Sequence, residues 1–298
     1  MLGAAWRDYG WLMILVTGAG GAVGTALLQE LKAGRHRARG GYRSAARAAE
    51  SGAGDDAVVF DLDRPESLAP ALEGVEAVFL LGAMGPAQTR QELAAVAAAT
   101  EAGVGHVVKL SVWRADERLT PIAELHRPVE EALESSGLAW TFLRPNYYMQ
   151  NFTRQMAAGI ASAGVIAQPA SRSPTSFVDA RDVARVAAAV LTDRGHDGEV
   201  HELTGPEALS FEQVAQTFSV ILGRPVRFAE LADEDARARM LDRGMSDFHA
   251  DALIEVSRTY RDGGAEILTS SVLELTGRPP TSLSQFIGEH REAFTAAS

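Results

Sequence analysis

The stretch Met13-Ile-Leu-Val-Thr-Gly-Ala-Gly-Gly-Ala-Val-Gly24 passes from an apolar segment into a cluster of glycines. Residues 14–16 show no polar alternation, which is typical of a central parallel strand buried on both faces. After the glycines, Val23, Leu27 and Leu31 recur at four-residue intervals, which predicts a helix that packs on a sheet. A strand, a glycine-rich turn and a helix in this order form the arrangement that binds the phosphates of a dinucleotide.

The glycines of this turn have distinct roles in such binding. Gly18 allows a turn with positive φ, Gly21 lets the backbone approach a phosphate, and Gly24 lets the helix pack closely on the strand. A glycine-rich turn without a ligand is the alternative, and the order of strand, turn and helix argues against it. We therefore expect cofactor contacts along this segment, at Thr17, Gly18, Gly21, Ala22, Val23 and Gly24.

The composition excludes several classes of function. Among 298 residues, 28 are Lys or Arg and 39 are Asp or Glu, which gives a net charge of −11. Since no basic run is present, a nucleic-acid partner is not expected. The absence of cysteine rules out disulfides and thiolate chemistry. No apolar run reaches the roughly 18 residues of a membrane span, so we expect a soluble cytoplasmic protein without a membrane partner.

The segment expected to form the second strand is rich in arginine. Residues 31–49 contain five arginines and no acidic residue. A fold that prefers NAD usually places an acid here for the ribose 2′-hydroxyl, whereas an arginine accommodates the 2′-phosphate of NADP. The segment therefore predicts a preference for NADP(H) over NAD(H), with Arg43 and Ser44 as ligands. A solvated basic edge is the alternative.

Further strands are expected in four apolar segments that alternate with helices, at 57–60, 77–81, 106–111 and 140–143. This alternation predicts an α/β fold in which a parallel sheet is doubly wound. Ligands of that fold lie at the carboxyl ends of the strands. We therefore expect cofactor contacts after the third and fourth strands, at Asp61, Leu62, Gly82 and Ala83. Asp61 and Asp63 lack a third ligand at suitable spacing, so no metal site is expected.

The sequence changes character where an amphipathic stretch begins, near Asn151. We expect a smaller α+β substrate lobe over 151–298. Residues 13–150 should form the dinucleotide-binding domain, and part of 176–205 should return to it. Residues 1–12 precede the first strand as an N-terminal extension without an assigned role.

Several segments beyond the glycine-rich turn resemble one protein family. They are Pro65-Glu-Ser-Leu68, His126-x-x-x-Glu130, Leu143-Arg-Pro-Asn146 and Phe177-Val-Asp-x-Arg-Asp-Val-Ala184. With the turn, they are similar to the NmrA-like atypical short-chain dehydrogenase/reductase family, and within it to the triphenylmethane-reductase and quinone-reductase group. The resemblance runs from about Met13 to Phe294. It implies NAD(P) binding in a Rossmann-like domain, cofactor contacts at Pro145 and Asn146, and a C-terminal lobe that covers the nicotinamide.

The chain departs from the wider superfamily at the catalytic centre. Typical short-chain dehydrogenases use Tyr-x-x-x-Lys beside a serine, with the tyrosine as proton donor. Here Ile122 and His126 stand at the positions of the tyrosine and the lysine, while Ser111 ends the fifth expected strand. His126 is a candidate ribose contact or proton donor, and a buried structural histidine is the alternative. Ser111 alone is a weak acid, and serine often hydrogen-bonds the backbone instead.

Aromatic residues follow the sixth expected strand. Tyr147, Tyr148 and Asn151 should lie near the nicotinamide and contact the substrate, and Tyr147 is a further catalytic candidate. Core packing of the tyrosines is the alternative interpretation.

Two functions are consistent with these patterns. The first is an NADPH-dependent oxidoreductase that passes hydride to an electron-poor small molecule such as a quinone or an aromatic dye. The second is a regulator similar to NmrA, which senses NADP(H) without turnover. The quinone-reductase signature and the intact second lobe favour the enzyme. The sequence leaves open whether the chain is a monomer or a homodimer.

Overall fold

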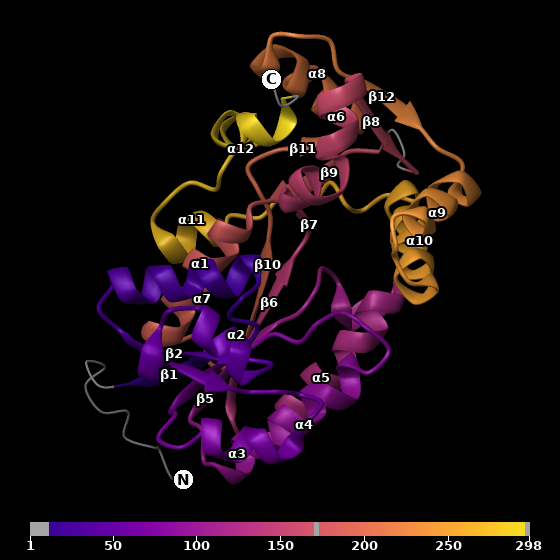
Figure 1. Cartoon of the computed structure of the whole chain (residues 1–298). Coiled ribbons are helices and arrows are strands. Elements are labelled where there is room, and N and C mark those ends of the chain that lie inside the picture. Colours follow the sequence, from indigo (N-terminus) through magenta and orange to yellow (C-terminus); the bar gives the residue numbers. More distant parts are fainter. Residues whose placement is uncertain (1–11, 170–172, 296–298) are drawn as a thin grey trace.

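A parallel sheet of seven strands forms the centre of the larger part of the molecule in the computed structural model, which describes residues 12–169 and 173–295 (Figure 1). The strand order is β3-β2-β1-β4-β5-β6-β10, and all neighbours are parallel. The strands are β1 (Met13–Val16), β2 (Arg37–Tyr42), β3 (Ala57–Val59), β4 (Ala77–Leu80), β5 (His106–Leu110), β6 (Ala139–Pro145) and β10 (Glu199–Leu203). Except for Leu12, the expected N-terminal extension lies outside the described residues.

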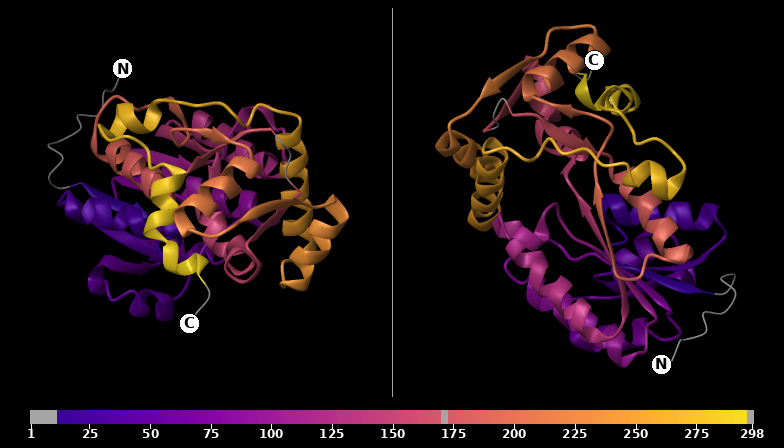
Figure 2. Two further views of the ribbon diagram at one scale, coloured as in Figure 1. Left: turned by 90° about the horizontal axis from the view of Figure 1, so that it is seen from above. Right: turned by 180° about the vertical axis from the view of Figure 1, so that it is seen from behind.

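Helices cover both faces of this sheet (Figures 1 and 2). One face carries α1 (Ala22–Ala33), α7 (Ala180–Thr192) and α11 (Ser271–Thr276). The other carries α3 (Leu68–Ala71), α4 (Gln88–Glu101) and α5 (Pro121–Ser136), and the short α2 (Ala45–Glu50) follows β2. The predicted doubly wound, Rossmann-like α/β fold is confirmed, with the reversal of strand order between β1 and β4.

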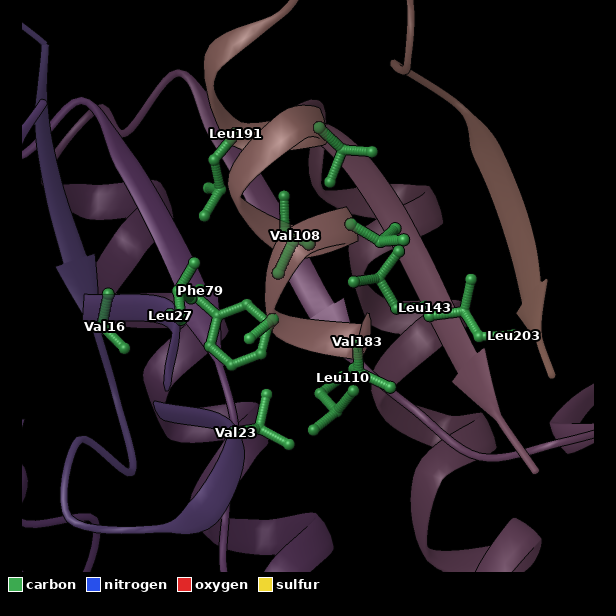
Figure 3. Packing of buried hydrophobic residues seen from close by; sticks show 14 of the residues in the cluster. Val16, Val23, Leu27, Phe79, Val108, Leu110, Leu143, Val183, Leu191 and Leu203 are labelled. Carbon is green, nitrogen blue, oxygen red and sulfur yellow. The ribbon is translucent and has the colours of Figure 1, made fainter. Parts of the chain in front are cut away.

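The central strands are buried on both faces, which explains why their sequences show no polar alternation. Val16 packs on the side of α1 and α7, whereas the preceding Leu15 packs on the side of α3 and α4. Figure 3 shows Leu27 and Val183, from α1 and α7, against Phe79 of β4. These side chains are fully buried, and each stabilises the fold by about 1.5–3 kcal/mol.

Two glycines allow the arginine-rich segment to form β2 despite its low strand propensity. A Cβ atom at Gly40 would lie 2.9 Å from the Tyr42 ring and 3.2 Å from the Ala19 Cβ atom. At Gly41 it would lie 3.0 Å from the Phe60 Cβ atom. The strand therefore fits only because these two positions carry no side chain, Gly40 where it passes Ala19 of the glycine-rich turn and Gly41 where it faces Phe60.

A smaller lobe lies at the carboxyl ends of the sheet strands (Figure 1). Its short strands form two sheets, β11-β9-β7 (Ala208–Leu209, Thr175–Val178, Tyr147–Tyr148) and β12-β8 (Arg227–Glu230, Val165–Gln168). Its helices include the π-helical turn η5 (Phe152–Met156), α6 (Ala157–Ala163), α8 (Phe211–Leu222), α9 (Asp233–Asp242), α10 (Asp247–Arg261) and α12 (Leu283–Glu289). Its core is rich in phenylalanine and contains Phe152, Phe177, Phe211, Phe218, Phe286 and Phe294. Over the described ranges, every helix is too short or too polar to span a bilayer.

A buried ion cluster joins β6, β10 and α5 on the face of the sheet that α5 covers. Arg144 makes two hydrogen bonds to Glu130, at 3.0 and 2.8 Å, and a third to Asp116 at 2.6 Å. Glu202 lies 3.6 Å from the same guanidinium, and its Oε2 atom is buried without a hydrogen bond. Burial raises the pKa of Glu202 to about 7, although the nearby Arg144 opposes this shift.

We expect Glu202 to make the free energy of unfolding depend on pH. Its folded-state pKa lies above the ordinary value of 4.5, so between pH 4.5 and about 7 the folded chain retains a proton that the unfolded chain loses. Stability therefore falls as pH rises through this window. The free energy of unfolding of Glu202→Gln relative to wild type should increase by about 1–3 kcal/mol between pH 4 and pH 8.

Urea unfolding at pH 4, 6 and 8 measures this difference. Glu199→Gln, on the same strand but exposed, is the control and should show no such increase. A constant difference between Glu202→Gln and wild type would show that the carboxyl group titrates alike in both states.

Candidate cofactor and substrate site

A cleft with a volume of about 1270 Å³ runs along the carboxyl ends of the sheet strands. This volume exceeds the roughly 300–1,000 Å³ of a site for a drug-sized ligand, so the cleft suits an extended molecule. It is bordered by the glycine-rich turn, by the ends of β2, β3 and β4, and by the segment from β7 into η5. Of the predicted site residues, those that line it are Gly18, Gly21, Ala22, Val23, Arg43, Asp61, Leu62, Gly82, Ala83, Tyr148 and Asn151.

The glycine-rich turn has the geometry expected from the sequence. Gly18 has φ of 60°. A Cβ atom at Gly24 would lie 2.3 Å from the Gly18 carbonyl oxygen, so the helix and the turn touch through their backbones. Helix α1 begins after Gly21 without a side-chain cap, and its first turn contains no acidic residue. Its first N–H groups are therefore available to an anion in the cleft.

Gly24 packs against Gly18 and does not line the cleft, and two further predicted cofactor residues likewise have structural roles instead. Thr17 is buried, and its hydroxyl accepts from the Leu81 N–H at 2.7 Å and donates to the Leu81 carbonyl oxygen at 3.0 Å. Ser44 caps α2 by accepting from the Arg47 N–H at 3.3 Å. Thr17 thus joins the end of β1 to the end of β4, beside the cleft.

Positive charge gathers at the β2 end of the cleft, where Lys32, Arg43 and Arg47 line it. Arg47 is paired with Glu50 at 3.0 Å. Arg43 has no ion pair or side-chain hydrogen bond with any residue that the structure describes. It is therefore the arginine best able to meet an anionic ligand group there.

At the other end of the cleft, two hydroxyl groups are buried without a partner. Tyr148 lines the cleft, and its hydroxyl makes no hydrogen bond with the described residues. Ser111 is not itself among the lining residues, but it follows Leu110, which is, and its Oγ atom is likewise buried without a partner among the described residues. Burial raises the pKa of Tyr148, so its hydroxyl stays protonated at neutral pH. Unpaired buried hydroxyls are costly, so these groups suit a ligand with polar atoms at this end.

The other predicted residues of the β6 end are directed into the lobe. Asn146 donates to Ser176 Oγ at 2.8 Å and to the Ala265 carbonyl oxygen at 3.0 Å, and it accepts from the Tyr260 hydroxyl at 2.6 Å. Its side chain therefore has little capacity left for a cofactor. Pro145 accepts from the Trp113 N–H at 3.1 Å. Neither residue is among those that line the cleft.

Tyr147 also points away from the cleft lining. Its ring packs edge-on against Phe177 at 5.2 Å and Phe211 at 6.1 Å. Burial raises the pKa of Tyr147, and a hydrogen bond with Asn151 opposes that shift. Of the two neighbouring tyrosines, Tyr148 is the one that the structure brings to the cleft.

His126 lies behind the strand ends, in a buried cluster that the sequence analysis did not identify. The cluster contains Lys109 and Glu92, both with fully buried side chains and 3.0 Å apart, and Lys109 contacts His126 Nδ1 at 3.0 Å. Burial and then the nearby Lys109 lower the pKa of His126 well below 6.5. The imidazole is therefore neutral at pH 7. The available signal was a lysine inside the apolar strand at 106–110, where a charge requires a buried partner.

Helix α10 connects the lobe to the loops at the strand ends. His249 Nε2 donates to the Met84 carbonyl oxygen at 3.0 Å, since a carbonyl can only accept. At the other end of the helix, the Thr259 hydroxyl donates to the Leu119 carbonyl oxygen at 3.2 Å. The helix lies beside the N-terminal end of α5 in both views (Figures 1 and 2). It thus bridges the loop after β4 and the region after β5.

The residues present fit a dinucleotide. The uncapped N-terminus of α1 and the side-chain-free turn suit a pyrophosphate, and the unpaired Arg43 suits a phosphate on the adenosine ribose. The orphaned hydroxyls of Ser111 and Tyr148 suit the polar groups of the nicotinamide half. Chemically, such a site can hold a hydride donor and an acceptor together.

Comparisons with known proteins agree with this geometry. Residues 12–280 match the sequence profile of the NmrA-like family. The chain is 39% identical to (4-alkanoyl-5-oxo-2,5-dihydrofuran-3-yl)methyl phosphate reductase of Streptomyces griseus, over 95% of this chain and 99% of the relative. It is 34% identical to NAD(P)H azoreductase of Xenophilus azovorans, over 96% and 100%. An Escherichia coli NADPH-dependent quinone oxidoreductase, solved with NADPH, has a TM-score of 0.85 at 27% identity and covers 94% of this chain and 100% of its own.

We expect Gly21→Val to abolish most dinucleotide binding while the protein stays folded. The backbone at Gly21 has φ of −85°, which other residues can adopt, but a side chain there would occupy space beside the phosphates. The dissociation constant for NADPH, measured by fluorescence titration, should rise at least about tenfold. Gly288→Val, at an open position in α12, is the control for the substitution itself. Unchanged NADPH affinity of Gly21→Val would mean that the turn is only structural.

Proposed function

Because the chain belongs to the NmrA-like family and is an NAD(P)H-dependent reductase, we propose that it transfers hydride from NADPH to conjugated, electron-poor acceptors such as quinones and aromatic dyes. The observation that carries the proposal is the lack of a charged proton donor at the end of the cleft expected to hold the nicotinamide. Among the described residues that line the cleft, there is no histidine. Neutral His126 lies behind it, and the hydroxyls of Ser111 and Tyr148 are weak acids.

This lack of a donor favours some acceptors over others. Reduction of a simple ketone produces a strongly basic alkoxide, so a positioned acid accelerates it by about 10²- to 10⁴-fold. A quinone spreads the added charge over its ring, and a cationic dye becomes neutral. For these acceptors it suffices that the cleft holds the two reacting carbons together and excludes water.

The names of the relatives fit this class of acceptor. An azo group and a quinone are both conjugated acceptors, and the Streptomyces relative is named for a dihydrofuranone whose ring double bond bears two carbonyl groups. Hydride addition to that double bond also yields a delocalised anion. We include conjugated lactones among the proposed acceptors for this reason.

The residues of this chain have separable tasks in the proposed reaction. The bound dinucleotide would supply the hydride. The first turn of α1 and the glycine-rich turn would bind the pyrophosphate, and Arg43 the 2′-phosphate. Ser111 and Tyr148 would donate hydrogen bonds at the reacting end. Arg154 lines the cleft without a partner in the described chain, and it would attract acceptors that carry an anionic group.

We expect NADPH to bind at least about tenfold more tightly than NADH. In Arg43→Ala, this gap, the ratio of the two dissociation constants, should fall by about tenfold or more. The reason is that an arginine–phosphate contact contributes about 1.5–3 kcal/mol. Fluorescence titration of both reduced cofactors measures the gap. Arg37→Ala, an exposed arginine of β2 outside the cleft lining, should leave the gap unchanged. Equal affinities of wild type for the two cofactors would refute the NADPH preference.

We expect kcat/KM for a quinone or a conjugated lactone to exceed that for a saturated ketone of matched ring size by about 10²-fold or more. His126→Ala should lower turnover of the quinone by less than about tenfold, because the neutral imidazole is not the proton donor. Steady-state assays of NADPH oxidation with each acceptor test both statements. A ketone preference that disappears in His126→Ala would instead identify His126 as the general acid.

A further inference from the structure

The buried cluster behind the cleft satisfies all three donors of one lysine. The ammonium of Lys109 meets the carboxylate of Glu92, the Leu110 carbonyl oxygen and His126 Nδ1. Lys109, on β5, and Glu92, on α4, have fully buried side chains. Lys109 therefore bonds β5 to both α4 and α5 without any contribution from water.

The histidine of the cluster has a defined protonation state. An ammonium can only donate, so His126 Nδ1 accepts, and the hydrogen of the neutral ring is on Nε2. Nε2 lies 3.0 Å from the terminal amide of Gln88, whose Oε1 atom would otherwise be buried without a partner. The Gln88 amide thus presents its oxygen to His126. The cluster then holds one positive and one negative charge.

Besides the bond of Lys109 to the Leu110 carbonyl oxygen, the cluster reaches the cleft through the backbone N–H group of Gly82. Glu92 Oε1 accepts from the Gly82 N–H at 2.8 Å. A Cβ atom at Gly82 would lie 2.7 Å from the same oxygen, so the contact leaves no room for a side chain. Thr17 holds the adjacent Leu81 from the other side, as described above. The Leu81–Gly82 peptide is therefore fixed from both directions where it borders the cleft.

The ion pair of Lys109 and Glu92 is not needed for the free energy of folding alone. Burial of each charge costs several kcal/mol, and apolar residues of similar volume commonly replace such a pair without loss. An apolar side chain, however, would leave the buried Gly82 N–H without an acceptor. Glu92 is thus needed for the position of the strand end, and Lys109 is needed to pair with its buried carboxylate.

We propose that Glu92, held by Lys109, is a positioning residue for the cofactor, because it fixes the ends of β4 and β5 against which the nicotinamide half lies. The proposal rests on the proposed function only in assuming that NADPH occupies the cleft. Glu92 is not among the described residues that line the cleft. It acts through Gly82 and, with Lys109, through Leu110, both of which line the cleft.

Two double variants separate positioning from packing. Lys109→Met combined with Glu92→Gln removes both charges and retains an oxygen for the Gly82 N–H. Lys109→Met combined with Glu92→Leu removes both charges and that oxygen. Neither variant leaves a buried unpaired charge, so each serves as the control for the other. The thermal unfolding midpoint, the dissociation constant for NADPH and kcat with a quinone are measured for both.

The glutamine variant should stay within about threefold of wild type in NADPH affinity and kcat. The leucine variant should lose about 10- to 100-fold in one or both. A purely structural role would lower the midpoint and leave the NADPH affinity of the folded protein unchanged. NADPH affinities and kcat values within threefold of each other in the two variants would overturn the proposal.

The NADPH titration keeps this test independent of turnover. If wild type binds NADPH but reduces no acceptor, the proposed function fails, and the ratio of the two NADPH affinities still decides the role of Glu92. If the leucine variant does not fold, Glu92→Met in the same Lys109→Met background provides the same comparison with a more flexible apolar side chain.

Discussion

The binding end of this molecule depends on a steric constraint between a helix and the turn before it. Position 24 has no room for a side chain, because the α1 backbone lies against the Gly18 carbonyl. This close approach places the uncapped first turn of α1 at the edge of the cleft. Any side chain at position 24 would push the helix away and move its N–H groups away from the phosphates. The neighbouring β2 makes room for the turn in the same manner, through Gly40, where a Cβ atom would lie 3.2 Å from the Cβ atom of Ala19.

Buried charges, rather than hydrophobic packing alone, fix the strand ends. The adjacent strands β5 and β6 each carry one buried cation toward a helix on the same face of the sheet. Lys109 pairs with Glu92 of α4, and Arg144 pairs with Glu130 of α5. Since such pairs have strict geometry and give little net stability, their value lies in holding the strands and helices in one register. The strand ends that border the cleft are thereby held in place on the side expected to hold the nicotinamide.

The sequence predicted those parts of the structure that depend on residues close to one another along the chain. The glycine spacing and the apolar runs were enough for the strand–turn–helix unit, for the doubly wound sheet and for the family, all of which the structure and the comparisons bear out. Residues whose roles depend on neighbours far along the chain were not predictable in this way. The Lys109–Glu92 pair forms only because α4 packs on β5, and Asn146 is bonded by Tyr260, which lies 114 positions later. Adjacent residues of a strand point to opposite sides, so the sequence could not decide which of Tyr147 and Tyr148 would reach the cleft.

The hydrogen bonds at both ends of α10 determine which contacts must break if the lobe separates from the strand ends. Separating this helix from the loops below it requires breaking the hydrogen bonds of His249 to Met84, of Thr259 to Leu119 and of Tyr260 to Asn146. At about 0.5–1.5 kcal/mol for each bond, these hydrogen bonds alone contribute roughly 1.5–4.5 kcal/mol to the cost of that separation, and the edge-to-face contact of the Trp113 and Tyr260 rings adds to it. Any separation of the lobe from these loops must therefore disrupt contacts of α10, whereas none of these bonds involves the phosphate-binding turn.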